Sequence, residues 1–155
     1  MAFRAARRRL IGVVGLLAAA ACRTPGPRPL AFGADQCAHC HMTLADARFA
    51  GEIVTATGRV IPFDDVGCLA VFLTTGGLSG ARVHSVWVHD FARPDSLLDV
   101  SAVTFLRSDR FQTPMDYRVV ALRPGAGADS VRAAVGGDRL DWEGVLRLIA
   151  GGRAP

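Results

Sequence analysis

The segment from Cys37 to Met42 gathers more metal-binding side chains than any other part of the chain. It reads Cys-Ala-His-Cys-His-Met and places two thiols, two imidazoles and one thioether within six residues. Sulfur donors select soft metals such as Cu(I), while the same residue types also bind zinc, attach haem or form disulfides. The chemistry of the chain is therefore expected to lie in this segment.

Several kinds of chemistry compete for Cys37 and Cys40. A thioredoxin-like redox pair normally opens a helix after a strand, whereas this pair follows a Pro-rich segment and precedes a hairpin pattern. The two cysteines could also form a plain disulfide without any metal. A structural zinc site usually needs a second Cys pair, and the sequence after Cys40 contains none. The spacing Cys37-x-x-Cys40-His41 also matches the attachment motif of c-type haem, with Met115 as a distal ligand. An electron-transfer haem protein is therefore the main alternative to a Cu(I) site.

A Cu(I) site is favoured by the soft donors. If the segment is extended, the side chains of Cys40 and Met42 lie on one face, because side chains alternate along an extended chain. Met115 follows Pro114 in a turn-like context and is a third candidate donor, although core filling would explain a methionine equally well. Cys68 lies in an apolar helical pattern and is interpreted as a small buried hydrophobic residue.

The amino terminus has the order of a secretory signal. An arginine-rich start is followed by an apolar run and by small residues that end just before Cys22. We expect a lipoprotein signal peptide over 1–21, lipidation of Cys22, a Pro-rich tether over 22–35 and a folded domain over 36–152. Ordinary signal cleavage before Cys22 is the competing reading. A lipid anchor would hold the domain on a bacterial membrane, facing the periplasm.

The net positive charge of the chain comes from the arginines of the predicted signal peptide. The formal net charge is +4, but four arginines and no acidic residue precede Cys22, which leaves fourteen basic residues against fourteen acidic ones. A near-neutral mature chain lacks the electrostatic basis for nucleic-acid binding.

The first half of the predicted domain reads as a hairpin, a helix and a strand. The hairpin consists of strands over 49–55 and 59–63 joined by Ala56-Thr57-Gly58. The pair Asp64-Asp65 is expected to cap a helix that ends at Gly76-Gly77, and its carboxylates are interpreted as cap and dipole partners. An alternating pattern over 82–90 predicts the next strand.

The second half loosely repeats this order. Strands are expected over 101–106 and 117–122, a helix over 129–135 capped by Asp129, and a helix over 141–150 ended by Gly151-Gly152. The pattern predicts an α+β fold with antiparallel sheets covered by helices.

Several short motifs together resemble the NosL family, the copper chaperone lipoproteins of nitrous oxide reductase maturation. The likeness covers nearly the whole mature chain and is strongest in its first half. The matching motifs are Cys37-x-x-Cys40-x-Met42, Arg48-Phe49-Ala50, Glu52-Ile53-Val54, Gly58, Phe63-Asp64-Asp65-Val66-Gly67-Cys68-Leu69 and Pro114-Met115.

The resemblance implies a monomeric domain of two ββα-type halves, distantly similar to organomercurial lyase, that binds one Cu(I) ion. It implies transfer of copper to apo nitrous oxide reductase with the help of an ABC-type membrane complex. Because delivery is ligand exchange, the protein is not expected to be an enzyme. Carried over by position, Cys40 and Met115 are the main copper ligands, Met42 lies close by and Cys37 is a further donor. His41 is an additional candidate at a position where many members of the family have glycine.

Overall fold

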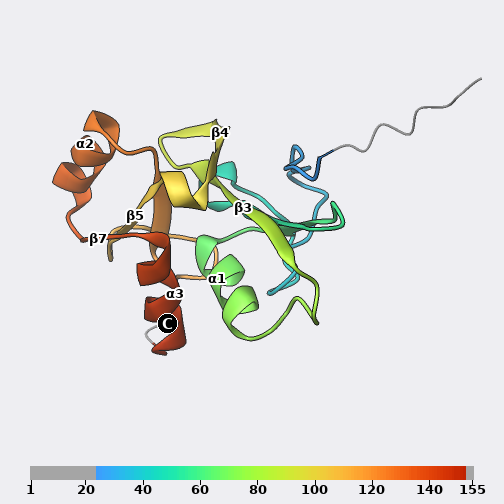
Figure 1. Cartoon of the computed structure of the whole chain (residues 1–155). Helices are drawn as coiled ribbons and strands as arrows, with labels where there is room; N and C mark the ends of the chain where they lie inside the picture. Colours follow the sequence, from blue (N-terminus) through green and yellow to red (C-terminus); the bar gives the residue numbers. More distant parts are fainter. Residues whose placement is uncertain (1–23, 153–155) are drawn as a thin grey trace, which may run out of the picture.

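The computed structural model describes residues 24–152 as an α+β arrangement of two antiparallel sheets and three helices (Figure 1). The predicted signal peptide and Cys22 lie outside the described residues. No helix in the described range is long and apolar enough to span a membrane.

The first half builds the larger sheet. Its elements are β1 (Gly51–Thr55), β2 (Val60–Phe63), α1 (Val66–Thr74), β3 (Val83–Asp90) and β4 (Arg93–Asp99), preceded by a 3-10 turn over Ala47–Phe49. The strands pair antiparallel in the order β2-β1-β3-β4. As predicted, β1 and β2 form a hairpin whose turn contains Gly58 in the left-handed region, at φ 83°.

The second half builds the smaller sheet. After a 3-10 turn over Val100–Ala102 come β5 (Thr104–Arg107), β6 (Val119–Leu122), α2 (Ala126–Val135), β7 (Asp138–Leu140) and α3 (Trp142–Ala150). The strands pair antiparallel in the order β6-β5-β7.

The two halves share one topology. In each half two strands form a hairpin, a helix follows, and the next strand pairs with the free edge of the first strand, giving β2-β1-β3 and β6-β5-β7. The prediction of an α+β fold with two ββα-type halves is confirmed.

A shared core joins the halves. Helices α1 and α3 lie side by side (Figure 1), and one cluster of buried side chains draws on both sheets and both of these helices. A smaller cluster lies between β6 and α2. Strand β6 serves both clusters, because Val119 and Ala121 face the large one while Val120 and Leu122 face the small one.

Helix α2 begins earlier than predicted. Its N-cap is Gly125, which has no side chain to make a cap hydrogen bond, so the assignment of Asp129 as a cap is wrong. Asp129 lies in the first turn, where its carboxylate favours the positive end of the helix dipole, and it pairs with Arg139 of β7. Strands β4 and β7 were not predicted. The first contains Pro94 and lies at the sheet edge, where a missing N–H is tolerated, and the second has only three residues.

Part of the predicted tether packs on the domain. The N–H of Arg28 donates to Oε1 of Glu52 at 3.0 Å, and the Arg28 guanidinium pairs with Asp35 at 2.7 Å. Leu30 is buried and belongs to the large core cluster. The Pro-rich sequence is therefore held against the first sheet from Arg28 onward.

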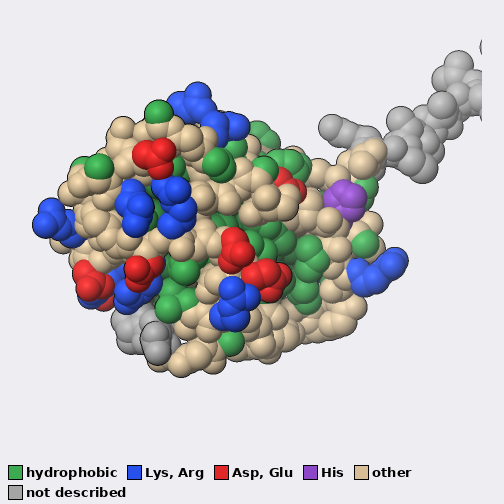
Figure 2. All heavy atoms as spheres, turned by 60° about the vertical axis from the view of Figure 1, so that its left-hand side comes forward, with side chains coloured by type: hydrophobic (Ala, Val, Ile, Leu, Met, Phe, Trp, Pro, Cys, Tyr) green, Lys and Arg blue, Asp and Glu red, His purple; other side chains and the backbone are tan. Residues whose placement is uncertain are grey.

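Basic and acidic side chains alternate on the face shown in Figure 2. The ion pairs of the second half include Arg139 with Asp129 and Arg118 with Asp116. This face therefore carries no extended field of one sign.

Candidate metal centre

A tight turn brings the ends of the Cys-x-x-Cys segment together. The N–H of Cys37 donates to the carbonyl of Met42 at 2.8 Å, and the N–H of His41 donates to the carbonyl of Cys37 at 3.0 Å. The N–H of Ala38 donates to the carbonyl of Pro62 at 2.9 Å, which fixes the turn to strand β2. This turn presents its cysteines to the amino-terminal end of α1.

The backbone of the turn reverses at His41. Its φ of 64° lies in the left-handed region, which favours glycine. A glycine, as expected at this position in many members of the family, would adopt this backbone without strain. The segment is therefore not extended, and the expectation that Cys40 and Met42 share one face of an extended chain is wrong. The Cys40 side chain is half-buried, whereas His41 is exposed and Met42 is 51% exposed.

Helix α1 supplies a third thiol. Asp65 caps the helix, its carboxylate accepting a hydrogen bond from the N–H of Gly67 at 2.7 Å. Cys68 lies in the first turn and is fully buried. Its predicted burial is confirmed, but it packs beside the other two cysteines rather than in a purely apolar environment.

Three thiols and one carboxylate form the centre. The Sγ atoms of Cys37, Cys40 and Cys68 and a carboxylate oxygen of Asp64 all lie within 4.8 Å of one another. All three cysteines of the described part of the chain are free thiols. Since a metal–sulfur bond is about 2.3 Å long, donors at this spacing can surround one ion.

The environment distributes protons unequally among the thiols. A hydrogen bond from Cys68 lowers the pKa of Cys37 to about 6, and the same contact raises the pKa of Cys68. Burial raises the pKa of Cys40 to about 11, and the hydrogen bond to Asp64 adds to this effect. The group therefore favours one thiolate, on Cys37, supported by neighbouring thiols.

Met115 reaches the same region from the second half. It lies in the connection between β5 and β6 and packs against the core cluster that contains Cys37 and Cys68. Its N–H donates to Oδ2 of Asp65 at 3.1 Å. Of the predicted donors, Cys37 and Cys40 come together in the thiol group, Met115 packs beside the core that holds it, and His41 and Met42 lie at the exposed turn.

Cys68 and Asp64 are the members of the centre that the sequence did not predict. The pair Asp64-Asp65 was expected to cap helix α1, and Asp65 does so. Asp64 instead accepts a hydrogen bond of 3.4 Å from the Cys40 thiol. Asp64 is almost fully buried, which is unusual for a carboxylate that has no ion-pair partner in the described part of the chain. The short spacing between this acidic pair and Cys68 was the signal available in the sequence.

The donor set points to a soft ion. Tetrahedral Zn²⁺ also accepts three thiols and a carboxylate, so the donor set fits both Cu(I) and Zn²⁺. Attachment of haem is not favoured by the geometry, because the Cys37 side chain is only 1% exposed and its thiol faces Cys40 and Cys68.

The fold and the centre place the chain among small α+β proteins with a sulfur-rich candidate metal site. The model of the NosL family matches residues 30–147, and the chain therefore belongs to the NosL family.

Among solved structures, the chain is similar to the crystal structure of the copper chaperone NosL from Shewanella denitrificans. The TM-score is 0.64 at 19% sequence identity, and the match covers 77% of this chain and 96% of that chain. At this identity the likeness establishes the fold. No curated protein matches the chain.

Proposed function

We propose that the protein binds one Cu(I) ion at the thiol centre and delivers it to apo nitrous oxide reductase. The observation that carries the proposal is the group of three thiols within 4.8 Å, in a chain that belongs to the NosL family. Thiolate and thioether sulfur prefer Cu(I) to harder ions, and the spacing of the donors fits a single ion.

The proposed copper ligands come from both halves. Cys40 and Met115 are the main ligands, Cys37 is a further thiolate, and Met42 and His41 are the donors nearest to solvent. Cys68 adds a third thiol from helix α1. The half-buried Cys40 and the exposed Met42 give copper a path from the buried thiols to an approaching partner.

Delivery by such a site is ligand exchange. A donor of the acceptor protein attacks the copper before the last donor of the carrier leaves, in the way that thiols exchange through a mixed intermediate. The thioethers of Met42 and Met115 are neutral, so they release copper without having to take up a proton. No general acid, general base or nucleophile is required, and the protein acts as a carrier rather than as an enzyme.

We further propose a lipid anchor on Cys22 that holds a monomeric carrier at the periplasmic side of the cell envelope. There it would work with an ABC-type complex that matures nitrous oxide reductase. These proposals rest on the arginine-rich and apolar leader and on the family.

Anaerobic titration of Cu(I) against a chromophoric chelator tests metal binding. One tight site is expected, with a large loss of affinity in Cys40→Ser and Met115→Leu. Unchanged affinity in both variants would remove the ligand assignment. A red protein with a Soret band, purified from cells that mature cytochrome c, would instead support the haem alternative.

Delivery has its own test. The copper-loaded protein is mixed with apo nitrous oxide reductase, and the copper content and absorption spectrum of the reductase are followed. Transfer should be faster than from a copper–glutathione solution of equal copper concentration. An equal rate would show that the carrier does not recognise this acceptor.

A further inference from the structure

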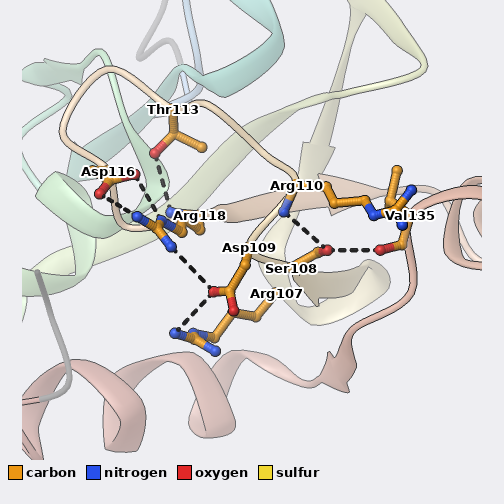
Figure 3. Close-up of polar contacts among 8 residues, drawn as sticks. All are labelled: Arg107, Ser108, Asp109, Arg110, Thr113, Asp116, Arg118 and Val135. Carbon is orange, nitrogen blue, oxygen red and sulfur yellow. Dashed lines mark hydrogen bonds and ion pairs between the residues drawn. The ribbon is translucent and has the colours of Figure 1, made fainter.

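The loop that carries Met115 holds its own shape. Within it, the N–H of Asp116 donates to the carbonyl of Thr113, and the N–H of Arg118 donates to the hydroxyl of Thr113, both at 3.1 Å. The Arg118 guanidinium binds Asp116 at 2.7 Å and Asp109 at 3.3 Å (Figure 3). Asp116 and Arg118 both have positive φ, at 56° and 59°. This unusual backbone is held in place by the loop's own hydrogen bonds and ion pairs.

One carboxylate joins this loop to the thiol-bearing helix. Oδ1 of Asp65 accepts the N–H of Gly67 at 2.7 Å, and Oδ2 accepts the N–H of Met115 at 3.1 Å. Asp65 is fully buried. Its two oxygens therefore fix the backbone of Met115 relative to the first turn of α1, which contains Cys68.

A second contact lies beside the first. A Cβ atom placed on Gly67 would overlap the Cβ, Cγ and Cδ2 atoms of Tyr117. The absence of a side chain at Gly67 therefore allows the Tyr117 ring to lie directly on the first turn of α1. Gly67 immediately precedes Cys68 in the sequence, and Tyr117 follows Met115 by two residues. Any larger residue at Gly67 must move this ring and the loop with it.

We propose that Asp65 and Gly67 are positioning residues that dock the Met115 loop on the thiol-bearing helix, so that sulfur donors of the two halves meet at one copper ion. The inference rests on the proposed function, in which Met115 is a copper ligand. A ligand contributed by a separate half must be held to within about 0.5 Å, and groups that orient metal ligands typically change metal affinity by about 10–100-fold when they are replaced. Asp65 and Gly67 touch no copper in this scheme and act through Met115.

A double-mutant cycle on the full chain tests this docking. In Gly67→Ala the affinity for Cu(I), measured by anaerobic chelator competition, should fall by about tenfold or more. In the Met115→Leu background the same substitution should cause no further loss, because the donor that it displaces is already absent. Gly127→Ala is the matched control: a Cβ at Gly127 would meet no atom of the described residues within 4 Å, so Cu(I) affinity should stay unchanged.

Asp65→Asn gives an independent arm. Asparagine retains a good N-cap for α1 but loses one of the two carboxylate oxygens that bind Gly67 and Met115. We expect the same pattern of affinity loss, absent in the Met115→Leu background. Hydrogen exchange of the Met115 amide in the metal-free protein should show protection in the wild type and its loss in Asp65→Asn and Gly67→Ala.

The outcomes separate the docking from the ligand assignment. If Met115→Leu alone leaves Cu(I) affinity unchanged, the ligand role in the proposed function is wrong. If Met115→Leu weakens Cu(I) binding but Gly67→Ala and Asp65→Asn do not, the docking inference is wrong. It is also wrong if these two substitutions weaken binding equally in the wild type and in the Met115→Leu background. An unprotected Met115 amide in the wild type would overturn it without any copper measurement. Should Gly67→Ala fail to fold, Asp65→Asn carries the same cycle.

Discussion

The Cys40 thiol donates a hydrogen bond of 3.4 Å to Oδ1 of Asp64, and this contact places a hard oxygen donor directly beside soft sulfur. Zn²⁺ accepts carboxylate ligands readily, whereas Cu(I) depends on sulfur. In Asp64→Asn we therefore expect Zn²⁺ affinity to fall by about tenfold or more, while Cu(I) affinity changes by less than about threefold. Parallel chelator competitions with the two metals measure the difference.

The exposed Asp95, which makes no side-chain hydrogen bond or ion pair within the described residues, provides the control Asp95→Asn. Neither affinity should change in this variant. A loss of Cu(I) affinity as large as the loss of Zn²⁺ affinity in Asp64→Asn would show that the carboxylate supports the whole centre and does not act on one metal.

The left-handed backbone at His41 predicts a stability gain. With φ at 64°, His41→Gly should raise the free energy of unfolding of the metal-free protein by about 1 kcal/mol, because a Cβ is disfavoured in this region. Chemical denaturation measures the gain. His41→Ala removes the same imidazole but keeps the Cβ, so it should show no comparable gain. A stability gain in both variants would show that the left-handed backbone at His41 is not the cause. If both variants lose Cu(I) affinity equally, the His41 imidazole is a copper ligand.

Cys68 can be tested through the contrast between serine and alanine. Its thiol is fully buried, lies within 4.8 Å of the Cys37 thiol and lowers the pKa of Cys37. A serine retains a hydrogen-bond donor without a copper ligand, and an alanine retains neither. If Cys68 is a copper ligand, both variants should lose about tenfold or more in Cu(I) affinity. Retention of affinity in Cys68→Ser alone would limit the role of Cys68 to supporting the Cys37 thiolate. Circular dichroism of each variant checks that the fold is intact.

Local signals predicted the elements that surround the centre, but not the centre itself. The hairpin closed at Gly58 and the helix capped by Asp65 each depend on a few neighbouring residues, and both were found as expected. The first turn of α1 meets the cysteine turn only through packing across thirty residues of chain, which no local pattern encodes. For that reason Cys68 was correctly predicted to be buried, while its place among the thiols was missed.

The limits are the same in the second half. The Pro114-Met115 turn makes Met115 a candidate donor and the family resemblance makes it a main ligand, but its attachment to Asp65 spans fifty residues of sequence and has no local signal. Aspartate commonly fills the N-cap position, which favours Asp129 as the cap, but the helix extends one turn further back to Gly125. Short strands such as β7 exist only because a neighbouring strand offers hydrogen bonds, so their own residues carry little signal.

The buried carboxyl of Glu52 should make the free energy of unfolding depend on pH in an unusual direction. Its side chain is fully buried in β1, where Oε1 accepts the N–H of Arg28 and Oε2 has no hydrogen-bond partner among residues 24–152. Burial raises the pKa of Glu52 to about 7, against the opposing effect of the Arg28 contact. The folded state therefore holds this proton more tightly than the unfolded state, in which the pKa is near 4.5.

The sign follows from this difference. Because the raised pKa belongs to an acid, the contribution of Glu52 to the free energy of unfolding falls as pH rises from about 4.5 to about 7, by at most about 3 kcal/mol. Glu52→Gln has no charge to bury at any pH. The difference in free energy of unfolding between this variant and the wild type should therefore shift in favour of the variant by about 1–3 kcal/mol between pH 4 and pH 8. Urea denaturation at both pH values measures it. Glu143→Gln changes the only other glutamate of the chain, which is exposed, and should show no such difference. An advantage of Glu52→Gln that is equal at both pH values would mean that the Glu52 carboxyl keeps an ordinary pKa in the folded protein, stabilised by the Arg28 N–H and by water reaching Oε2.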